Sequence, residues 1–494
     1  MDAGAGVTRV FVLYTGGTLG MRPVDPNNPA SPLVPASRAE LAERLAGLCA
    51  EEGIHWEMGG LTDEEGRELP PLDSADLSAY HWIRMAAALE QVYPDYDGFV
   101  VLHGTDTMAY TASALSFLLV NLGKPVVLTG AQRPVFSTRT DARQNFVNAL
   151  FVAGYRATGL PLVPEVVIGF GDALLRGNRT RKVSTTAWQG FASPNYPALG
   201  SLGETIRIHP EHVRPVPEGP FYVHRKLEDQ VLDITLFPGM QATHLSNLLE
   251  LPELSGVVLR TFGTGNAPGG RELLEVIGRA ASEPNGKTIL TVTQCIEGMV
   301  ELGLYASSSA LLEDGVIGGF DLTPEAALAK LMWILANYEG HEVRTQLMLD
   351  QRGEQSLNMY ELDYPAAGRR HDPVPVAGAS ARPAGPISRA RLRKAVLRIY
   401  GLGLSDTRRG EELELRVFLN ASGITPETPP DDVRCAGVIR QTYQGPGSTL
   451  IIADLTPGVR RLMDEERPFQ LTLTAGRKHF WYRRMELALA VSAH

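Results

Sequence analysis

Cysteine is scarce in this sequence, because Cys49, Cys295 and Cys435 are the only three among 494 residues. Thiols this far apart have neither the spacing of a disulfide framework nor that of a zinc site. We therefore expect no metal, no cofactor and a reducing, cytoplasmic location. The first residues lack a basic segment followed by an apolar core and a cleavage site, so we expect no signal peptide. No apolar run reaches the length of a membrane-spanning helix, and we expect no membrane partner.

Positive charge is also in short supply. The 46 Lys and Arg residues are outnumbered by 56 Asp and Glu residues, and the formal net charge is -10. The chain also lacks a basic stripe with interleaved aromatic residues, so we expect no nucleic-acid partner. Hydrophobic residues make up 44% of the chain, which is typical of a globular protein, and the length predicts more than one domain.

A strand followed by a glycine turn near the N-terminus is the first candidate site. Residues 10–14 form a continuous apolar run, typical of a strand that is buried on both faces. Residues 15–18 follow with the sequence Thr-Gly-Gly-Thr, whose glycines allow a tight turn and close backbone approach. Ligands of open α/β sheets bind outside the carboxyl ends of the strands, so we expect Thr15 and Thr18 at such a site. The alternative is a plain turn with capping hydroxyls.

A second unit repeats this arrangement. It consists of a strand, a polar turn, a helix and another strand, over residues 98–103, 104–107, 108–121 and 126–128. We expect Gly123 to end the helix as its C-cap, and the whole to form a βαβ unit. Thr105 and Asp106 follow the carboxyl end of the first strand, so they either extend the same ligand site or cap the helix.

The later sequence falls into further segments. Strands and helices alternate between residues 231 and 337, the loop at 22–37 could serve as a lid, and the proline-rich stretch at 194–220 indicates a crossover. Strict alternation over residues 412–420 is typical of a β-sheet domain. We predict a large N-terminal α/β domain, a crossover, a smaller C-terminal α/β domain, a Pro/Gly/Ala-rich linker and an all-β, sandwich-like domain, over residues 1–200, 201–225, 226–360, 361–390 and 391–494.

Nine short motifs occur along the chain in a characteristic order. They are YTGGTLGM, LDSAD, VVLHGTDTMAYTASALSFLL, KPVVLTGAQRP, RGNRTRK, FASPN, GTGNAP, LTVTQC and GVIGGFDLT. In these motifs the chain resembles the bacterial type I (cytoplasmic) L-asparaginases over roughly its first 355 residues. The resemblance implies two α/β domains and hydrolysis of L-asparagine, or of L-glutamine, with release of ammonia. It also implies a homodimer or homotetramer, and it does not extend to the β-rich segment.

The resemblance also implies two sets of site residues. The catalytic set is Thr18, Thr105, Asp106 and Lys182, and the substrate-binding set is Asp73, Ser74, Ala75, Thr105 and Asp106. A threonine hydroxyl attacks an amide only when a base takes its proton. A lysine can be that base only in its neutral form, which burial favours. Asp106 could orient the lysine or hold the substrate ammonium, backbone N–H groups of the two turns could stabilise the oxyanion, and either threonine could attack first.

Two departures from the family pattern affect these expectations. Family members usually carry a tyrosine in the lid loop, whereas residues 22–37 contain none and the next tyrosine is Tyr80. In some type I relatives a second asparagine binds as an allosteric effector at the positions matched by Arg260, Thr293, Gln294 and Cys295. Arg181 stands where such a relative has threonine, so effector binding stays an open expectation.

Two other functions remain alternatives. A sensor that binds asparagine without turnover would agree with the missing lid tyrosine. The amidase subunit of a tRNA-dependent amidotransferase shares the strand-turn motifs. That subunit normally carries extra sequence before the first TGGT motif, and here only a few residues precede the first strand.

Overall fold

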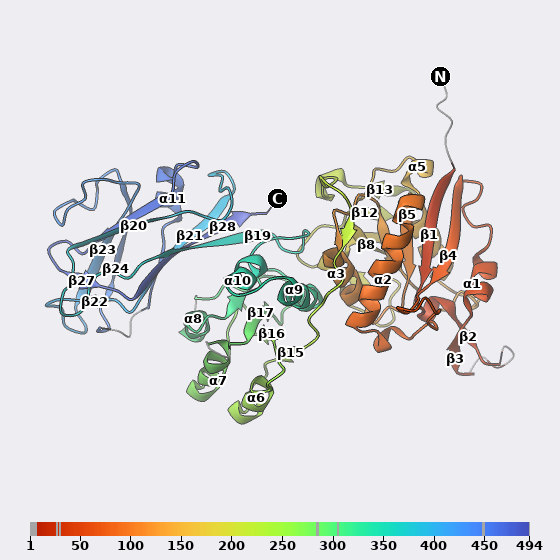
Figure 1. The fold of residues 1–494 in the computed structure, drawn as a ribbon, viewed down its shortest axis with the longest axis horizontal. Coiled ribbons are helices and arrows are strands. Elements are labelled where there is room, and N and C mark those ends of the chain that lie inside the picture. The colour runs from red at the N-terminus through yellow and green to blue at the C-terminus, as the bar shows by residue number, and fades with distance from the viewer. Residues whose placement is uncertain are drawn as a thin grey trace, which may run out of the picture. The chain divides into compact units, whose positions relative to one another are not determined.

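The computed structural model describes residues 7–25, 28, 31–282, 286–303, 306–446 and 450–493. The chain divides into two compact units, which are Met1–Leu347 with Gln351–Glu354, and Met348–Asp350 with Gln355–His494 (Figure 1). The first unit holds two α/β domains and the second is built of antiparallel strands, which confirms the predicted fold class. Among the described residues, no helix is long and apolar enough to cross a membrane.

The N-terminal domain is built on an eight-stranded sheet. Its strands, in spatial order, are β13 (Ile206–Ile208), β12 (Gly200–Leu202), β9 (Ala173–Arg176), β8 (Val166–Phe170), β7 (Val126–Thr129), β5 (Gly98–Leu102), β1 (Thr8–Tyr14) and β4 (Ile54–Gly60). The five strands from β8 to β4 are parallel, and the other three are antiparallel to their neighbours. The chain places β4 on one side of β1 and β5 on the other, so the strand order reverses between β1 and β5. Ligands of open α/β sheets bind at such a reversal point.

Helices cover this sheet, which is why its central strands are apolar on both faces. Residues of α1 (Arg38–Leu45) and α4 (Ala142–Ala153) share one core with alternate residues of β1, β5 and β7. The helices α2 (Ala79–Val92) and α3 (Met108–Leu118) pack against each other and against the sheet (Figure 1). Almost every residue of α3 is buried, because α9 (Pro324–Asn337) of the C-terminal domain packs on it as well.

The structure differs from the predicted elements in three places of this domain. The predicted loop 22–37 contains a hairpin of β2 (Met21–Pro23) and β3 (Leu33–Pro35), although residues 26, 27, 29 and 30 of it lie outside the described residues. The predicted crossover contains β12 and β13, whose three-residue length is too short for a visible alternation of side chains.

The third difference concerns the end of α3. We predicted this helix to run to Asn121 with Gly123 as its C-cap, but its C-cap is Leu119. The chain leaves the helix early because β6 (Leu119–Val120) pairs with β14 (Tyr222–Val223). This pairing depends on a segment about a hundred residues away, so the helical pattern gave no sign of it. Other short elements of the domain are η3 (Tyr93–Asp95), α5 (Tyr155–Thr158) and η5 (Pro210–His212).

The C-terminal α/β domain contains a parallel sheet whose strands follow the chain order. The strands are β15 (Val231–Thr235), β16 (Gly256–Thr261), β17 (Thr288–Thr293) and β18 (Ile317–Gly318). The helices are α6 (Ala242–Leu249), α7 (Arg271–Ala281), α8 (Ala306–Glu313), α9 and α10 (His341–Leu347). The hydroxyl of Thr323 accepts a hydrogen bond from the N–H of Ala326 and so caps α9 at the predicted start.

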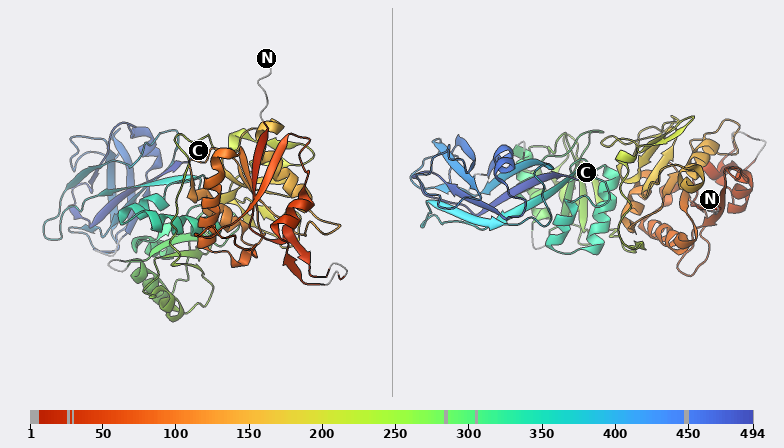
Figure 2. Two further views of the ribbon diagram at one scale, coloured as in Figure 1. Left: turned by 45° about the vertical axis from the view of Figure 1, so that its right-hand side comes forward. Right: turned by 90° about the horizontal axis from the view of Figure 1, so that it is seen from above.

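The second unit is a β-sandwich, as predicted. One sheet contains β19 (Leu357–Tyr364), β28 (Arg484–Ser492), β21 (Leu392–Tyr400) and β25 (Leu450–Asp454), and the other contains β20 (Val376–Ala381), β26 (Phe469–Thr474), β23 (Glu412–Leu419) and β24 (Cys435–Thr442). Buried residues of both sheets, such as Leu397 and Leu415, belong to one core. Figure 2 shows these strands, coloured turquoise to blue, in two further views. The unit also contains β22 (Gly403–Leu404), α11 (Thr456–Leu462) and β27 (Phe480–Trp481).

The segment that we expected to be a linker, residues 361–390, contains strands. It includes the end of β19 and the whole of β20, which pairs with β26 along six residues at the edge of its sheet. The sequence of β20 is Val-Ala-Gly-Ala-Ser-Ala, and such small residues give the composition of a linker rather than that of a strand. The apolar run at residues 449–453 predicts the strand found as β25, and its first residue, Thr449, lies outside the described residues.

Candidate active site

The two glycine turns meet at the carboxyl ends of β1 and β5. Tyr14 and Leu102 are opposite each other in the register of these strands, so the turns that follow are neighbours. A Cβ atom on Gly17 would lie 2.2 Å from the backbone nitrogen of Gly104. Gly17 also has a φ of 85°, so only glycine suits this contact on both counts. The predicted meeting of the two turns is therefore found in the structure.

A third segment, which carries the LDSAD motif, joins the same place. The N–H of Leu72 donates to the carbonyl of Thr15 at 2.9 Å, and the N–H of Gly17 donates to the carbonyl of Leu72 at 3.2 Å. These bonds bring Ser74 against the second turn, where a Cβ atom on Gly104 would lie 2.5 Å from Ser74 Oγ. The backbone therefore assembles three segments that are separated by tens of residues.

Lys182 makes direct contact with two other predicted catalytic residues. Its ammonium donates hydrogen bonds to Thr105 Oγ1 at 2.7 Å and to Asp106 Oδ1 at 2.6 Å. The side chain of Lys182 is 17% exposed and that of Asp106 is 71% exposed, so the pair lies at the border between protein and solvent. Lys182 is held there by β10 (Arg181–Lys182), which pairs with β11 (Phe191–Ala192).

The two threonines of the first turn have different surroundings. The buried hydroxyl of Thr15 donates to the carbonyl of Leu102 at 2.9 Å, so it stabilises the turn and has no proton free for a ligand. For Thr15 the plain structural interpretation is the better one. Thr18 begins the 3₁₀ helix η1 (Thr18–Gly20), is half-buried, and directly follows the contact between Gly17 and Gly104. Thr18 therefore stands at the turn that faces Thr105.

The LDSAD residues are partly occupied with their own turn. Asp73 Oδ1 accepts the N–H of Ala75 at 3.0 Å and caps the 3₁₀ helix η2 (Ser74–Asp76). The carbonyl of Ser74 accepts a hydrogen bond from the hydroxyl of Thr107 at 2.8 Å, while the side chain of Ser74 is buried beside Gly104. Of this set, Ser74 is the residue whose side chain lies against the second turn.

A buried histidine forms a hydrogen bond with the second glycine turn, and the sequence analysis did not identify it. His103 Nδ1 donates to the carbonyl of Gly104 at 2.6 Å. Its Nε2 accepts from the hydroxyl of Thr111 at 2.8 Å, and that hydroxyl accepts from the indole of Trp82 at 2.9 Å. Complete burial lowers the pKa of His103 to about 4, so the ring stays neutral near pH 7. The sequence did contain a sign of this role, because His103 ends an otherwise apolar strand.

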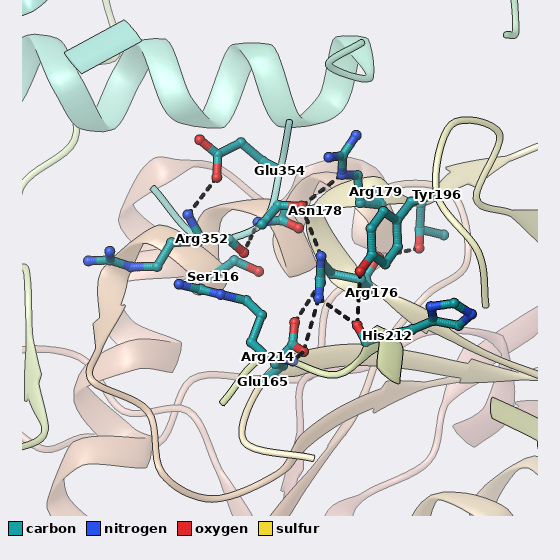
Figure 3. Close-up of polar contacts among 12 residues, drawn as sticks. Ser116, Glu165, Arg176, Asn178, Arg179, Tyr196, His212, Arg214, Arg352 and Glu354 are labelled. Atoms are coloured by element: carbon teal, nitrogen blue, oxygen red, sulfur yellow. Dashed lines mark hydrogen bonds and ion pairs between the residues drawn. The ribbon is translucent and has the colours of Figure 1, made fainter. Parts of the chain in front are cut away.

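Two buried arginines hold the segment that leads to Lys182 (Figure 3). Arg176 donates to both carboxylate oxygens of Glu165, at 2.6 and 3.2 Å. Arg179 pairs with Asp321 at 2.7 Å, which joins the two α/β domains. Both arginines also donate to the carbonyl of Gly353. The RGNR stretch, η4 (Gly177–Arg179) with its flanks, therefore has a structural role that sequence reasoning did not identify.

The acceptor of these bonds is the short segment Gln351–Glu354. Asn178 donates to the carbonyl of Arg352 at 3.0 Å, so three side chains of the RGNR stretch reach this segment. Glu354 and Lys330 form a fully buried ion pair at 2.7 Å. Burial by itself raises the pKa of Glu354, but the Lys330 ammonium and the N–H groups of residues 351 and 352 outweigh it and hold that pKa below its usual range.

The candidate effector residues also come together, at the carboxyl ends of β16 and β17. The amide of Gln294 donates to the carbonyls of Leu236 and Arg260 at 2.7 and 2.9 Å. The hydroxyl of Thr293 accepts the N–H of Cys295, whose side chain is exposed. The guanidinium of Arg260 is paired with Asp233. The four residues are neighbours in space, and their binding of an effector stays a prediction.

The hairpin that corresponds to the lid is held by a tyrosine from the strand before it. Tyr14 is buried, and its hydroxyl donates to the carbonyl of Ala36 at 3.3 Å. A Cβ atom on Gly20 would lie 2.3 Å from this hydroxyl oxygen, so only glycine fits above the ring. Burial raises the pKa of Tyr14 to about 12. Tyr14 therefore fixes the base of the hairpin.

The site combines hydroxyl groups, a carboxylate and an ammonium, which suits nucleophilic attack with proton transfer. Among the described residues, no group of three or more His, Cys, Asp and Glu side chains is placed to hold a metal ion.

The two α/β domains match known protein families. The family model described as "Asparaginase, N-terminal" matches residues 9–214, and that of the "Glutaminase/Asparaginase C-terminal domain" matches residues 230–348. L-asparaginase 1 of Escherichia coli (strain K12) is 39% identical over 346 residues, which cover 70% of this chain and 97% of that protein. The 60 kDa lysophospholipase of Mus musculus is 38% identical over 369 residues, covering 71% of this chain and 63% of that protein. The crystal structure of L-asparaginase I from Vibrio cholerae is 36% identical, with a TM-score of 0.61, over 71% of this chain and 99% of that one. The chain therefore belongs to the asparaginase family.

Proposed function

We propose that this chain hydrolyses the side-chain amide of L-asparagine to give L-aspartate and ammonia. The observation that carries the proposal is the contact of Lys182 with both Thr105 and Asp106, at 2.7 and 2.6 Å, where the strand order reverses. This contact places a proton acceptor beside a hydroxyl nucleophile, at the edge of the sheet where open α/β proteins bind their ligands.

The proposed reaction has two halves. In the first, a threonine oxygen attacks the amide carbon and its proton passes to the neutral form of Lys182. The protonated Lys182 then gives this proton to the amide nitrogen, the carbon–nitrogen bond breaks, and ammonia leaves. In the second, water cleaves the resulting ester, releases aspartate and restores the threonine. Thr105 has a direct proton route to Lys182, and Thr18 follows the glycine of the neighbouring turn. N–H groups at these turns would stabilise the negative oxygen of each tetrahedral intermediate.

We assign substrate binding to the exposed Asp106 and to the turn that carries Ser74. The carboxylate of Asp106 keeps most of its surface in solvent, which leaves it able to accept the substrate ammonium. Ser74 would hydrogen-bond the substrate carboxylate from beside Gly104, and Asp73 and Ala75 would hold that turn in shape. L-glutamine is the alternative substrate, one methylene longer.

Steady-state release of ammonia, with asparagine and glutamine compared, tests this function. Asparagine that binds without release of ammonia would assign the chain to the sensor class. Activity that requires an aminoacyl-tRNA and a partner subunit would assign it to the amidotransferases. Release of fatty acid from a lysophospholipid would instead give it the activity in the name of the mouse relative.

We also propose a cytoplasmic homodimer or homotetramer. The family supports assembly, and three unpaired cysteines support a reducing location. Sedimentation of the full chain tests the assembly, and a fully active monomer would contradict it.

A further inference from the structure

A separate cavity of about 70 Å³ lies in the first unit and is lined by none of the proposed catalytic residues. Its walls come from α3 and β6, from β8 and the residues before it, from the stretch that follows η5, and from the segment Gln351–Glu354. Three of its lining residues are arginines, Arg176, Arg214 and Arg352, and Glu165 is the one carboxylate among them (Figure 3). The cavity is therefore strongly basic within a protein of net charge -10.

The carboxylate of Glu165 is already fully engaged. Its two oxygens accept hydrogen bonds from Nε and Nη2 of Arg176, at 2.6 and 3.2 Å. Oε1 also accepts the backbone N–H of Arg214 at 2.6 Å. Glu165 thus neutralises Arg176, and no carboxylate of the described residues forms an ion pair with the guanidinium of Arg214 or Arg352. The nearby Glu354 is paired with Lys330.

Arg214 and Arg352 have donors to spare. No described residue accepts a hydrogen bond from the guanidinium of Arg214. Arg352 donates through Nη1 to the carbonyl of its own neighbour Gln351 at 2.8 Å and lies 5.7 Å from the centre of the Trp333 ring. Its Nε is buried and has no partner in the part of the chain that the structure describes.

The two guanidinium groups also repel each other. Burial and the positive charge of Arg214 lower the pKa of Arg352, and they outweigh the opposite effect of the Glu354 carboxylate. Two like charges at one partly enclosed cavity destabilise the folded unit unless a negative charge lies between them.

We propose that this cavity binds a small tetrahedral oxyanion, phosphate or sulfate, between Arg214 and Arg352. The planar fork of arginine matches such an anion with two parallel hydrogen bonds. The volume is several times the roughly 10–15 Å³ that one water needs by the same measure, so the cavity can hold a group of about five heavy atoms. A free amino acid fits less well, because its ammonium would meet the same two positive charges.

A bound anion would connect segments that are distant in sequence. Arg214 follows η5, whereas Arg352 belongs to the segment whose carbonyls accept from Arg176, Asn178 and Arg179. Since the unfolded chain has no such site, the anion would stabilise the first unit against unfolding.

The test is thermal unfolding of the full chain in chloride, phosphate or sulfate at equal ionic strength and pH. We expect a saturable rise in Tm of about 2–4 °C or more with phosphate. Arg214→Gln and Arg352→Gln should abolish this rise, and the control Arg207→Gln, which removes an exposed arginine, should keep it. If the site binds both anions, sulfate should raise the Tm as much as phosphate does. If the site selects phosphate, sulfate should leave the Tm at its value in chloride.

A second readout separates anion binding from a purely structural role of the arginines. In low-salt chloride, Arg214→Gln should unfold at the same or a higher temperature than the wild type, because it removes the repulsion. This variant also keeps the backbone bond to Glu165, so it should fold even if Arg352→Gln does not. A rise in phosphate no larger than in chloride, or a full rise in Arg214→Gln, overturns the proposal.

Discussion

Lys182 Nζ lies 2.7 Å from Thr105 Oγ1, although 77 positions of sequence separate the two residues. The lysine reaches the threonine because β10 ends a segment that Arg176 and Arg179 hold in place. The pair is therefore the product of a buried network, and the activity that we propose depends on that network as well as on the pair.

Loss of either turn hydroxyl should remove activity. We expect Thr105→Ala and Thr18→Ala each to lower kcat by roughly 10³-fold or more, because the proposed reaction needs both hydroxyls and uses one of them as the nucleophile. Thr205→Ala, at an exposed position between β12 and β13, is the matched control and should keep wild-type turnover. The measurement is ammonia release per folded protein. Turnover close to wild type in one of the two site variants would exclude that threonine from the mechanism.

The lysine should be required for rate and not for folding. We expect Lys182→Met and Lys182→Arg both to lower kcat by about 10²–10⁴-fold, because neither side chain can accept a proton. The pair with the exposed Asp106 adds little stability, so the free energy of unfolding should change by no more than about 1 kcal/mol. Steady-state kinetics and urea unfolding of the same samples measure both quantities. An active Lys182→Arg enzyme would mean that the positive charge, rather than proton transfer, is what the reaction needs.

His103 should make the first unit sensitive to acid. Its pKa is about 4 in the folded state against 6.5 in the unfolded chain. Between pH 6.5 and pH 4 the unfolded chain therefore binds a proton that the folded chain excludes, and stability falls as the pH falls, by up to about 3 kcal/mol. This part of the pH dependence should vanish in His103→Gln and persist in the exposed control His55→Gln. Equal slopes of unfolding free energy against pH in all three proteins would contradict the assignment.

The buried pair of Lys330 and Glu354 should show strong coupling. Lys330→Met leaves a carboxylate buried without its cation, and we expect it to lower the free energy of unfolding by about 3–5 kcal/mol. The double variant Lys330→Met with Glu354→Gln should recover much of this loss, since no buried charge remains. Urea unfolding of both single variants and the double variant forms the cycle. Additive losses in the double variant would show that the two side chains do not interact.

The position of a truncation should decide its effect. A chain cut after residue 356 keeps Gln351–Glu354, so we expect it to retain the kcat of the full chain. A chain cut after residue 348 loses the carbonyl acceptor of Arg176 and Arg179 and the partner of Lys330, and it should unfold at a lower temperature with reduced activity. A large loss of kcat in the longer, folded truncation would mean that the second unit contributes to the active site.

The sequence by itself determined those features that depend on neighbouring residues. Apolar runs predicted the parallel strands, the alternation of strands and helices between residues 231 and 337 predicted a second α/β domain, and alternation over residues 412–420 predicted β23. The glycine turns and the ordered motifs also identified the candidate site, because a turn that needs glycine and hydroxyl groups leaves a local pattern. The sequence did not predict the strands β12, β13 and β20. Three residues, or a run of small residues, carry no periodic signal.

Only the tertiary structure decided which polar residues face the site and which hold it together. Thr15 and Thr18 belong to the same motif, yet a hydrogen bond to Leu102 on the neighbouring strand makes Thr15 structural. Arg179 would be taken from its sequence for a solvent-exposed charge, but Asp321, 142 positions away, makes its complete burial favourable. Burial of a charge costs several kcal/mol unless a partner is present, and the partner is supplied by the fold and not by the local sequence.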